Sequence, residues 1–354
     1  MKLLHIADVH LDSPLTSHLP AGKVRQRRAQ LLGVFRRAVE LGVSMGVSGV
    51  LIAGDLFDDE RVSRRAMHTA LDVIASYPAL PFYYLGGNHE GEVLRAEGAQ
   101  IQNLHIFGEK MQCYSLGEVD IWGRYGTSRR MFDELTLNRS RKNIVMLHGE
   151  LRERSAEDGV IGLNDAKERG IDYLALGHYH TYSTEKIDER GVAVYPGVPE
   201  GRGFDECGTK GVVILDTDRM THTFHPLMGR VLYDISVDLK GADDEREIRR
   251  RIDEAVTSVL PEDMLRVTLV GEVPFSLVRD TEALAAWYAE KYYYFELRDR
   301  CTAEIDKEAL LYDKSLFGEL VRTVEGDAGL SDEERTSILQ CASMALAGEE
   351  WIHQ

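Results

Sequence analysis

Short apolar runs that each end in a polar cluster recur through the first two thirds of the chain. Five of them span residues 3–7, 49–53, 81–85, 143–147 and 172–176. Apolar runs of this length bounded by turn-forming residues are typical of buried strands. Residues 24–46 and 63–77 have apolar side chains at helical spacing, and residues 113–125 and 192–216 have the alternating pattern of antiparallel hairpins. Strands that alternate with helices, together with hairpins, predict an α/β sandwich with mixed sheets.

The last third of the chain has a different organisation. Residues 232–237 and 265–270 are predicted strands around a helix at 244–260, followed by a helix at 281–289 and a strand at 292–297. Ser331, with Glu334 three residues later, has the pattern of a capping box and predicts a helix to about residue 346. We therefore predict a main domain at 1–228, a small α/β capping domain at 229–302 and a helical segment at 303–354.

The net charge of −17 is unevenly distributed. Residues 231–354 hold 28 Asp and Glu against 14 Lys and Arg, a net of −14, which leaves −3 for residues 1–230. Because affinity for nucleic acid comes mostly from basic side chains, the total charge argues at first against such a substrate. That objection applies to the last third and not to the nearly neutral first domain, where two divalent ions would bring the net charge to about +1.

Other properties of the chain exclude several classes of protein. No apolar run approaches the ~20 residues that a membrane helix needs, and the charged N-terminus has no signal-peptide pattern. The four cysteines lie far apart without a CxxC pair, so we expect reduced thiols. These observations predict a cytoplasmic protein with no membrane association.

Each predicted strand end carries side chains that can bind metal ions. These clusters are Asp8-Val9-His10, Gly54-Asp55-Leu56-Phe57-Asp58, Gly87-Asn88-His89-Glu90, Leu147-His148-Gly149 and Gly177-His178-Tyr179-His180. In an open α/β sheet the carboxyl ends of the strands meet at one edge, so the five clusters should converge there. Carboxylates, imidazoles and an amide without thiolates suit Mn, Fe, Zn or Mg, and seven ligands suit two ions.

The order of these motifs resembles that of the calcineurin-like metallophosphoesterases over about residues 1–215. Within that superfamily, the chain looks most like the SbcD/YhaO type of bacterial DNA repair exonucleases. The residues that carry this closer resemblance are Ala7 to Pro14, Gly54 to Asp58, Tyr195 to Glu206 with Lys210-Gly211 and, less specifically, Asp313 to Val324. The resemblance implies a four-layer αββα sandwich, two divalent ions with manganese favoured, a DNA substrate, an SbcC-type SMC-like coiled-coil ATPase as partner, and a homodimer.

The resemblance also implies a role for each candidate residue. One metal ion would be held by Asp8, His10, Asp55 and His180, and the second by Asp55, Asn88, His148 and His178, with Asp55 bridging. His89 would act as the catalytic acid while metal-bound hydroxide attacks phosphorus. Some members of the nuclease family have His where this chain has Asp58, although the bacterial type commonly has Asp there. This departure puts in doubt any role of a second histidine in processing duplex ends.

Several alternatives stay open on the sequence alone. The metal motifs also fit a phosphoesterase for a smaller substrate, such as a phosphoprotein, a nucleotide or a cyclic nucleotide, or a scaffold without activity. Arg202 is a candidate phosphate contact or a member of a loop salt bridge. The predicted helix from Ser331 docks a partner or is simply a capped helix. Two groups of side chains also have two interpretations each. A solvated helix face or a phosphate-binding face is formed by Arg25, Arg27, Arg28, Arg36 and Arg37. The aromatic side chains of Tyr292 to Phe295 pack the core of a strand or stack on bases.

Overall fold

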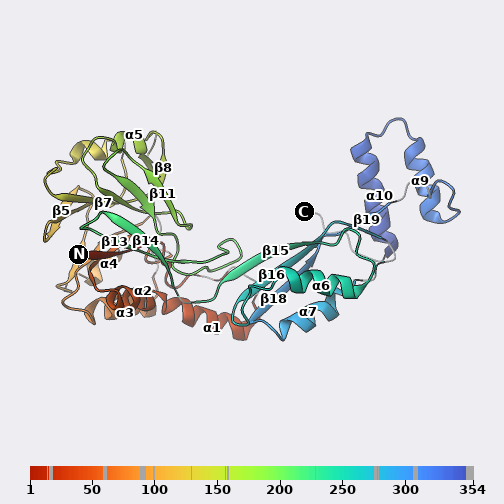
Figure 1. The fold of residues 1–354 in the computed structure, drawn as a ribbon, viewed down its shortest axis with the longest axis horizontal. Coiled ribbons are helices and arrows are strands. Elements are labelled where there is room, and N and C mark those ends of the chain that lie inside the picture. Colours follow the sequence, from red (N-terminus) through yellow and green to blue (C-terminus); the bar gives the residue numbers. More distant parts are fainter. Residues whose placement is uncertain are drawn as a thin grey trace. The chain divides into compact units, whose positions relative to one another are not determined.

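The computed structural model of the chain separates into two compact units, Met1–Leu232 and Tyr233–Gln354 (Figure 1). It describes residues 1–13, 15, 19–58, 62–87, 93–98, 100–128, 130–155, 157, 159–227, 229–274, 277, 279–305 and 310–347. The boundary between the units lies a few residues beyond the predicted end of the first domain at residue 228. The predicted three-part domain division itself stays a prediction.

The first unit contains two six-stranded sheets. One has the order β14 (Thr221–Pro226), β13 (Gly211–Asp216), β1 (Lys2–Ile6), β2 (Val47–Ala53), β3 (Phe82–Leu85), β4 (Leu104–Ile106). The other has the order β11 (Ser183–Lys186), β12 (Val192–Tyr195), β10 (Tyr173–Gly177), β7 (Lys142–His148), β6 (Val119–Gly123), β5 (Gln112–Leu116). Strands β1 to β4 run parallel, as do β6, β7, β10 and β12, and antiparallel strands β14, β11 and β5 form three of the four edges.

Strand alternation builds the layers of this unit. In β1, Leu4 and Ile6 face the helices, whereas Leu3 points to the second sheet, because successive side chains of a strand point to opposite faces. The helices on the outer face of the first sheet are α2 (Val34–Ser44), α3 (Arg64–Ala75) and α4 (Val93–Gly98), and α1 (Ala21–Leu32) precedes and contacts α2. The second sheet is covered by η1 (Met131–Glu134), α5 (Leu163–Ala166) and the strand pair β8 (Glu150–Arg152) and β9 (Val160–Gly162). The predicted αββα sandwich is confirmed.

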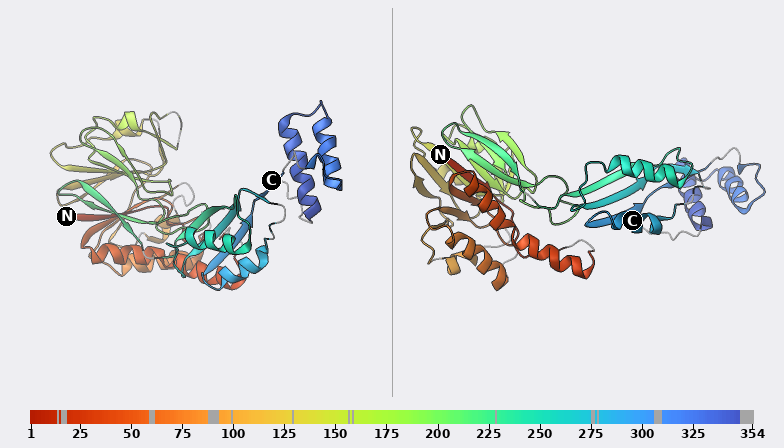
Figure 2. Two further views of the ribbon diagram at one scale, coloured as in Figure 1. Left: turned by 45° about the vertical axis from the view of Figure 1, so that its right-hand side comes forward. Right: turned by 60° about the horizontal axis from the view of Figure 1, so that its bottom comes forward.

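The second unit has its own core. Strands β15 (Leu232–Asp238), β16 (Met264–Val270) and β18 (Tyr294–Asp299) form a sheet, one face of which packs against α6 (Glu245–Ala255) and α7 (Thr281–Ala289) (Figures 1 and 2). Strands β17 (Glu272–Pro274) and β19 (Thr302–Glu304) form a separate pair. Helices α9 (Leu316–Gly326) and α10 (Asp332–Ala347) enclose a small cluster of apolar side chains. The capping box that opens α10 is confirmed, because Ser331 and Glu334 each accept the other's backbone N–H.

The structure differs from two of the predicted elements. Residues 24–46 form two helices that break at Gly33, and not one continuous helix. Residues 192–216 do not form a hairpin, because β12 pairs with β10 and β11 in the second sheet while β13 pairs with β1 and β14 in the first. An alternating pattern identifies a strand but does not name its neighbour, and here the connecting loop crosses from one sheet to the other.

Candidate metal centre

Four strand ends bring candidate ligands to one edge of the sandwich. Asp8 and His10 follow β1, Asp55 follows β2, His148 is the last residue of β7, and the His178–His180 turn follows β10. Because β1 and β2 are parallel neighbours, as are β7 and β10, their carboxyl ends lie together. Among the described residues, two groups have ligand atoms within 4.8 Å of one another: Asp8, His10 and His180, and Asp8, Asp55 and His148.

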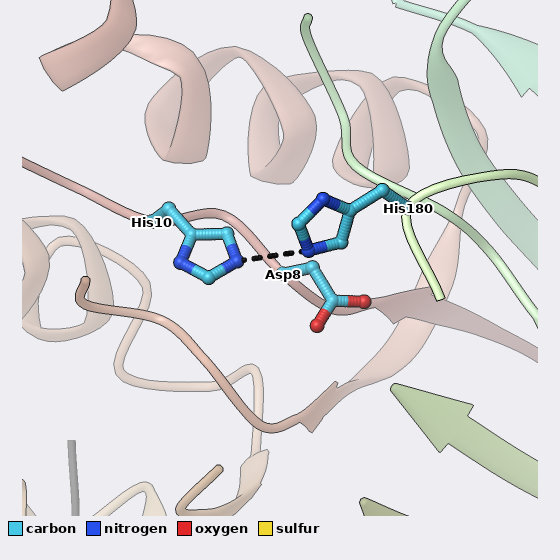
Figure 3. Close-up of side chains that lie close together, drawn as sticks. All are labelled: Asp8, His10 and His180. Atoms are coloured by element: carbon cyan, nitrogen blue, oxygen red, sulfur yellow. Dashed lines mark hydrogen bonds between the residues drawn. The ribbon is translucent and has the colours of Figure 1, made fainter. Parts of the chain in front are cut away.

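The first group is formed by Asp8, His10 and His180 (Figure 3). The Nε2 atoms of His10 and His180 lie 3.3 Å apart, and the Asp8 carboxylate lies beside them. Two nitrogens at the usual metal distance of about 2.0–2.1 Å and a tetrahedral angle would be about 3.3–3.4 Å apart. Asp8 and His10 are buried, and His180 is half-buried. The spacing therefore suits two nitrogen ligands of a single ion.

The second group is formed by Asp8, Asp55 and His148, all of them buried. His148 Nδ1 lies 2.9 Å from the carbonyl oxygen of Ala53, so Nδ1 carries the proton and donates it. Nε2, the other ring nitrogen, faces the carboxylate of Asp55, with 3.3 Å between Nε2 and Oδ2. Both Oδ atoms of Asp8 accept the backbone N–H of His178, at 2.9 and 3.0 Å.

Three predicted residues are not in these groups. The His178 ring lies against the His148 ring, with 5.6 Å between centroids, and is exposed. Asn88 and His89 lie outside the described residues. Gly87, which precedes them, lies so close to Asp55 that a Cβ atom there would be 1.9 Å from Asp55 Oδ1. The assignment of these three side chains therefore stays a prediction.

The backbone is strained at the candidate ligands. Seven non-glycine residues in the described part of the chain have positive φ, and four of them are Asp8 (52°), His10 (48°), Asp55 (49°) and His178 (111°). Such conformations cost on the order of 1–3 kcal/mol each and cluster at functional sites, where the surrounding structure enforces them. These conformations lie at residues that follow β1, β2 and β10, at the edge where the candidate ligands gather.

Glycines make room for the candidate ligands. A Cβ atom at Gly54 would lie 2.2 Å from His148 Nδ1, and one at Gly177 would lie 2.8 Å from the same atom and 2.0 Å from the carbonyl oxygen of Ala53. The sequence analysis did not predict a role for these glycines in shaping the site. The signal was present, because a glycine directly precedes Asp55, Asn88 and His178 in their motifs.

The electrostatics of the site favour a cation. Burial raises the pKa of Asp8 to about 7, with the nearby Asp55 carboxylate adding to the rise and His148 opposing it. Burial lowers the pKa of His148, but the contact with Asp55 and the charges of Asp8 and Asp55 outweigh it and raise the value to about 9. The buried carboxylates and the imidazole thus compete for protons. A divalent ion can bind the same groups in their deprotonated forms and take the place of those protons. The donor set fits hard or borderline metal ions.

Three charged side chains, those of Asp58, Glu206 and Arg202, form a charged ring of contacts beside His10 and His180. The sequence analysis did not predict these contacts. Asp58 Oδ1 lies 3.0 Å from His10 Nδ1, and Glu206 Oε1 lies 2.8 Å from His180 Nδ1. Arg202 contacts both carboxylates, at 2.9 Å from Asp58 and 2.7 Å from Glu206. Arg202 thus has the loop salt bridge that was one of its two interpretations. As a substrate contact, Arg202 stays a prediction.

Neither interpretation of the basic face of residues 25–37 fits Arg27. Its side chain is buried and contacts the carboxylate of Glu200 and, at 2.6 Å, the carbonyl oxygen of Gly201. Arg37 contacts the other oxygen of Glu200. The helical pattern could not reveal this role, because the acidic partner lies more than 160 residues away. These arginines hold the loop after β12 against α1 and α2.

A family model described as calcineurin-like phosphoesterase matches residues 1–182, just over half of the chain. The chain belongs to this family. The resemblance to the calcineurin-like metallophosphoesterases is thereby confirmed. No described helix is both long and apolar enough to span a membrane.

Curated relatives include a metallophosphoesterase and DNA double-strand break repair proteins. The chain is 28% identical to the metallophosphoesterase YhaO of Bacillus subtilis over 238 residues, which cover 61% of this chain and 57% of YhaO. It is 27% identical to the DNA double-strand break repair protein Mre11 of Aeropyrum pernix, covering 59% and 56% of the two chains. The Mre11 protein of Sulfolobus acidocaldarius is 23% identical over 96% of this chain and 94% of its own length. For the first two relatives, the match spans little more than half of their length.

Solved structures also match this calcineurin-like phosphoesterase. The protein TT1561 of Thermus thermophilus aligns with a TM-score of 0.46 and 13% identity over 64% of this chain and 98% of its own. A dimetal phosphatase from Danio rerio aligns with a TM-score of 0.40 and 11% identity over 60% and 91% of the two chains.

Proposed function

We propose that the chain is a two-metal-dependent phosphodiesterase that hydrolyses DNA. The observation that supports this function most is the convergence of carboxylates and imidazoles from four strand ends into two overlapping groups. Asp8 belongs to both groups. Asp55 Oδ2 lies 3.3 Å from His148 Nε2 and 4.0 Å from His10 Nε2, so it reaches toward both. A ligand that bridges two ions must reach both groups, and the position of the Asp55 carboxylate allows this.

The proposed ligands of the two ions follow from these groups and from the family motif. Asp8, His10, Asp55 and His180 would hold one ion. The other would be held by Asp55 and His148, together with Asn88 and His178. Manganese is the proposed ion, because the family resemblance favours it and the donors are oxygen and nitrogen atoms without a thiolate. Iron, zinc and magnesium are the alternatives.

The chemistry divides between the ions and the side chains. When bound, two divalent ions supply Lewis acidity, which makes water more acidic and offsets charge on phosphoryl oxygens. His148 donates from Nδ1 to the carbonyl oxygen of Ala53, so Nε2, once deprotonated, would be the nitrogen that binds an ion. Asp8 is oriented by the backbone N–H of His178, which contacts both of its carboxylate oxygens. These residues pre-organise the edge of the sandwich for an anionic phosphodiester.

His89 is the proposed acid for the leaving oxygen. It follows Asn88 directly in the motif, and the family resemblance gives it no metal. A positioned acid of this kind contributes about 10²- to 10⁴-fold to the rate. His89→Ala should therefore lower kcat by that factor while two Mn²⁺ ions still bind, as measured by isothermal titration calorimetry. Empty metal sites in His89→Ala would contradict this division of roles.

DNA is the proposed substrate because the relatives include Mre11 proteins named for double-strand break repair, one of which aligns over 96% of this chain. The competing substrate is a smaller phosphoester, such as a phosphoprotein, a nucleotide or a cyclic nucleotide. Linear duplex and single-stranded DNA should be cleaved with Mn²⁺ and not with a chelator. The same preparations should be assayed on bis(p-nitrophenyl) phosphate, with Asp55→Asn as the control for contaminating nucleases.

The outcomes of this assay separate three functions. Cleavage of DNA that requires Mn²⁺ and Asp55 supports the nuclease. Cleavage of the nitrophenyl diester without cleavage of DNA supports the smaller substrate. Loss of both activities in a protein that still binds Mn²⁺ supports a scaffold without activity.

A coiled-coil ATPase of the SbcC type is the proposed partner, with α9 and α10 as its docking segment. Four large apolar side chains among the described residues of this part of the chain are exposed: Leu311 (41%), Tyr312 (88%), Leu316 (75%) and Ile338 (36%). Leu316→Ser should reduce co-purification with such an ATPase while leaving the apolar cluster of Val321, Val324 and Leu339 intact. Truncation after Gly326, which removes α10, should abolish it. A cytoplasmic homodimer completes the proposal, and analytical ultracentrifugation tests the dimer.

A further inference from the structure

His10 and His180 are each held from the side opposite the metal edge by a carboxylate. Asp58 faces Nδ1 of His10 at 3.0 Å, and Glu206 faces Nδ1 of His180 at 2.8 Å. The two carboxylates come from different segments, since Asp58 follows β2 and Glu206 lies between β12 and β13. The same arrangement, a carboxylate behind each imidazole, is thus built twice around one candidate ion site.

A carboxylate at Nδ1 fixes the tautomer of an imidazole. It accepts the Nδ1 proton, which leaves the lone pair on Nε2, and it sets the rotation of the ring. The Nε2 atoms of His10 and His180 are the atoms that face each other at 3.3 Å beside Asp8. Both rings are therefore set with their ligating atoms toward the same point before any ion binds.

Arg202 joins the two carboxylates. Its guanidinium contacts Asp58 through Nη1 at 2.9 Å, and it contacts Glu206 through Nη2 at 2.7 Å and Nε at 3.1 Å. The backbone N–H of Arg202 also donates to Glu206, at 2.7 Å. A rigid guanidinium fork of this kind fixes both the position and the orientation of its partners. It also balances two negative charges that would otherwise be available to bind a cation themselves.

His148, in the second group, is supported differently. Its Nδ1 donates to the carbonyl oxygen of Ala53, a backbone atom at the end of β2. Backbone support does not depend on the side chains of Asp58, Arg202 or Glu206. The two candidate ion positions thus differ in what holds their imidazoles, and a substitution in the charged ring should affect only one of them.

We propose that Asp58, Glu206 and Arg202 are positioning residues that set His10 and His180 for one of the two metal ions, so that the affinity for this ion can be lowered without loss of the other. The inference rests on the proposed two-metal centre. It assigns no contact with substrate to the three residues. Outer carboxylates of this kind typically change metal affinity about 10- to 100-fold.

Glu206→Gln is the test, and Glu200→Gln is its matched control. Glutamine has one acceptor oxygen, which His180 and Arg202 would have to share. Glu200 lies in the same loop, is as buried as Glu206 (5% against 4% exposed) and also contacts two cationic side chains, those of Arg27 and Arg37. Glu200 has no contact with either histidine among those the structure describes, so a purely structural effect should appear in both variants alike.

The measurement is Mn²⁺ binding to the metal-free full chain by titration calorimetry, with electron paramagnetic resonance to count free Mn²⁺. Wild-type protein and Glu200→Gln should bind two ions with the same affinities. Glu206→Gln should weaken one ion about 10- to 100-fold and leave the other within about twofold. Anomalous scattering at the manganese edge should locate the lost ion beside His10 and His180.

Two outcomes would overturn different claims. If the wild type binds two ions and Glu206→Gln binds both with unchanged affinity, the positioning role is wrong. If the wild type binds no ions, the proposed metal centre itself is wrong. Should Glu206→Gln not fold, Asp58→Asn serves in its place, because the Asp58 side chain is 24% exposed and makes the equivalent contact with His10; unchanged affinities in that variant would equally overturn the role.

Discussion

Two buried histidines in the first unit show how neighbours decide what an imidazole does. His5 lies in β1 between the two sheets, and His148 ends β7 at the edge of the sandwich. Burial lowers the pKa of both. It takes His5 to about 3, where Tyr173 Oη lies 2.9 Å from Nδ1. At His148 the carboxylates of Asp55 and Asp8 reverse the shift and raise the pKa to about 9. Similar burial therefore gives a neutral structural residue in one place and a candidate metal ligand in the other.

The largest effect should come from removing Asp55, the carboxylate nearest to His148. Asp55→Asn should weaken Mn²⁺ binding by more than about 100-fold, because it removes the proposed bridging ligand rather than an outer partner. Wild-type protein at a Mn²⁺ concentration 100 times Kd should be about 2.7 kcal/mol more stable per bound ion than with a chelator. Thermal unfolding with and without EDTA measures this difference, which should vanish in the variant.

Asp172→Asn is the control for that experiment. Asp172 is also buried and pairs with Arg190, but it lies away from the metal edge, at the start of β10. This variant should lose stability and keep the full effect of EDTA. A chelator effect that persists in Asp55→Asn would mean that the carboxylates at His148 do not create the cation site.

An intermediate effect should come from crowding the His148 ring. Gly54 (φ +90°) and Gly46 (φ +74°) both have left-handed backbones, but only at Gly54 would a Cβ meet the His148 ring. Alanine should cost about 1–2 kcal/mol at either position because of the backbone conformation. Gly54→Ala should in addition weaken one Mn²⁺ ion, on the order of 10-fold or more. Calorimetric titration of both variants decides this, and equal Mn²⁺ affinities would contradict the packing argument.

The smallest effect should be the pH dependence contributed by His5. Between the ordinary pKa of 6.5 and the folded value of about 3, the unfolded chain binds a proton that the folded chain does not. The stability from neutral His5 is therefore present above pH 6.5 and is lost as the pH falls. At pH 5.5 the loss is about 1.4 kcal/mol.

His5→Gln should remove this part of the pH dependence and leave Mn²⁺ affinity unchanged. Urea unfolding of both proteins at pH 7.5 and 5.5, at one Mn²⁺ concentration, measures it, because contributions from other groups cancel between the proteins. An identical pH dependence in wild type and variant would show that His5 is not held neutral by its surroundings.

Much of the fold and part of the site could be predicted from local patterns. The five apolar runs are strands, and the side chains after β1, β2, β7 and β10 lie together as expected. Parallel strands bring their carboxyl ends to one edge by topology alone, so the prediction needed no distances. Apart from the helix break at Gly33, the wrong predictions concern long-range choices. The pattern at 192–216 gives two strands but not the sheet that each joins, and the basic pattern of Arg27 gives no sign of Glu200.

The sequence by itself determined which residues could bind metal and the end of the fold at which they would meet, because strand periodicity and motif order are local properties. Only the tertiary structure decided which nitrogen of His10, His148 and His180 faces the site, and which side chains stand behind them. Tautomer and ring orientation depend on partners such as Ala53, Asp58 and Glu206, which are distant in sequence and lie close only after folding. The same packing gives His5 an aromatic neighbour and His148 two carboxylates.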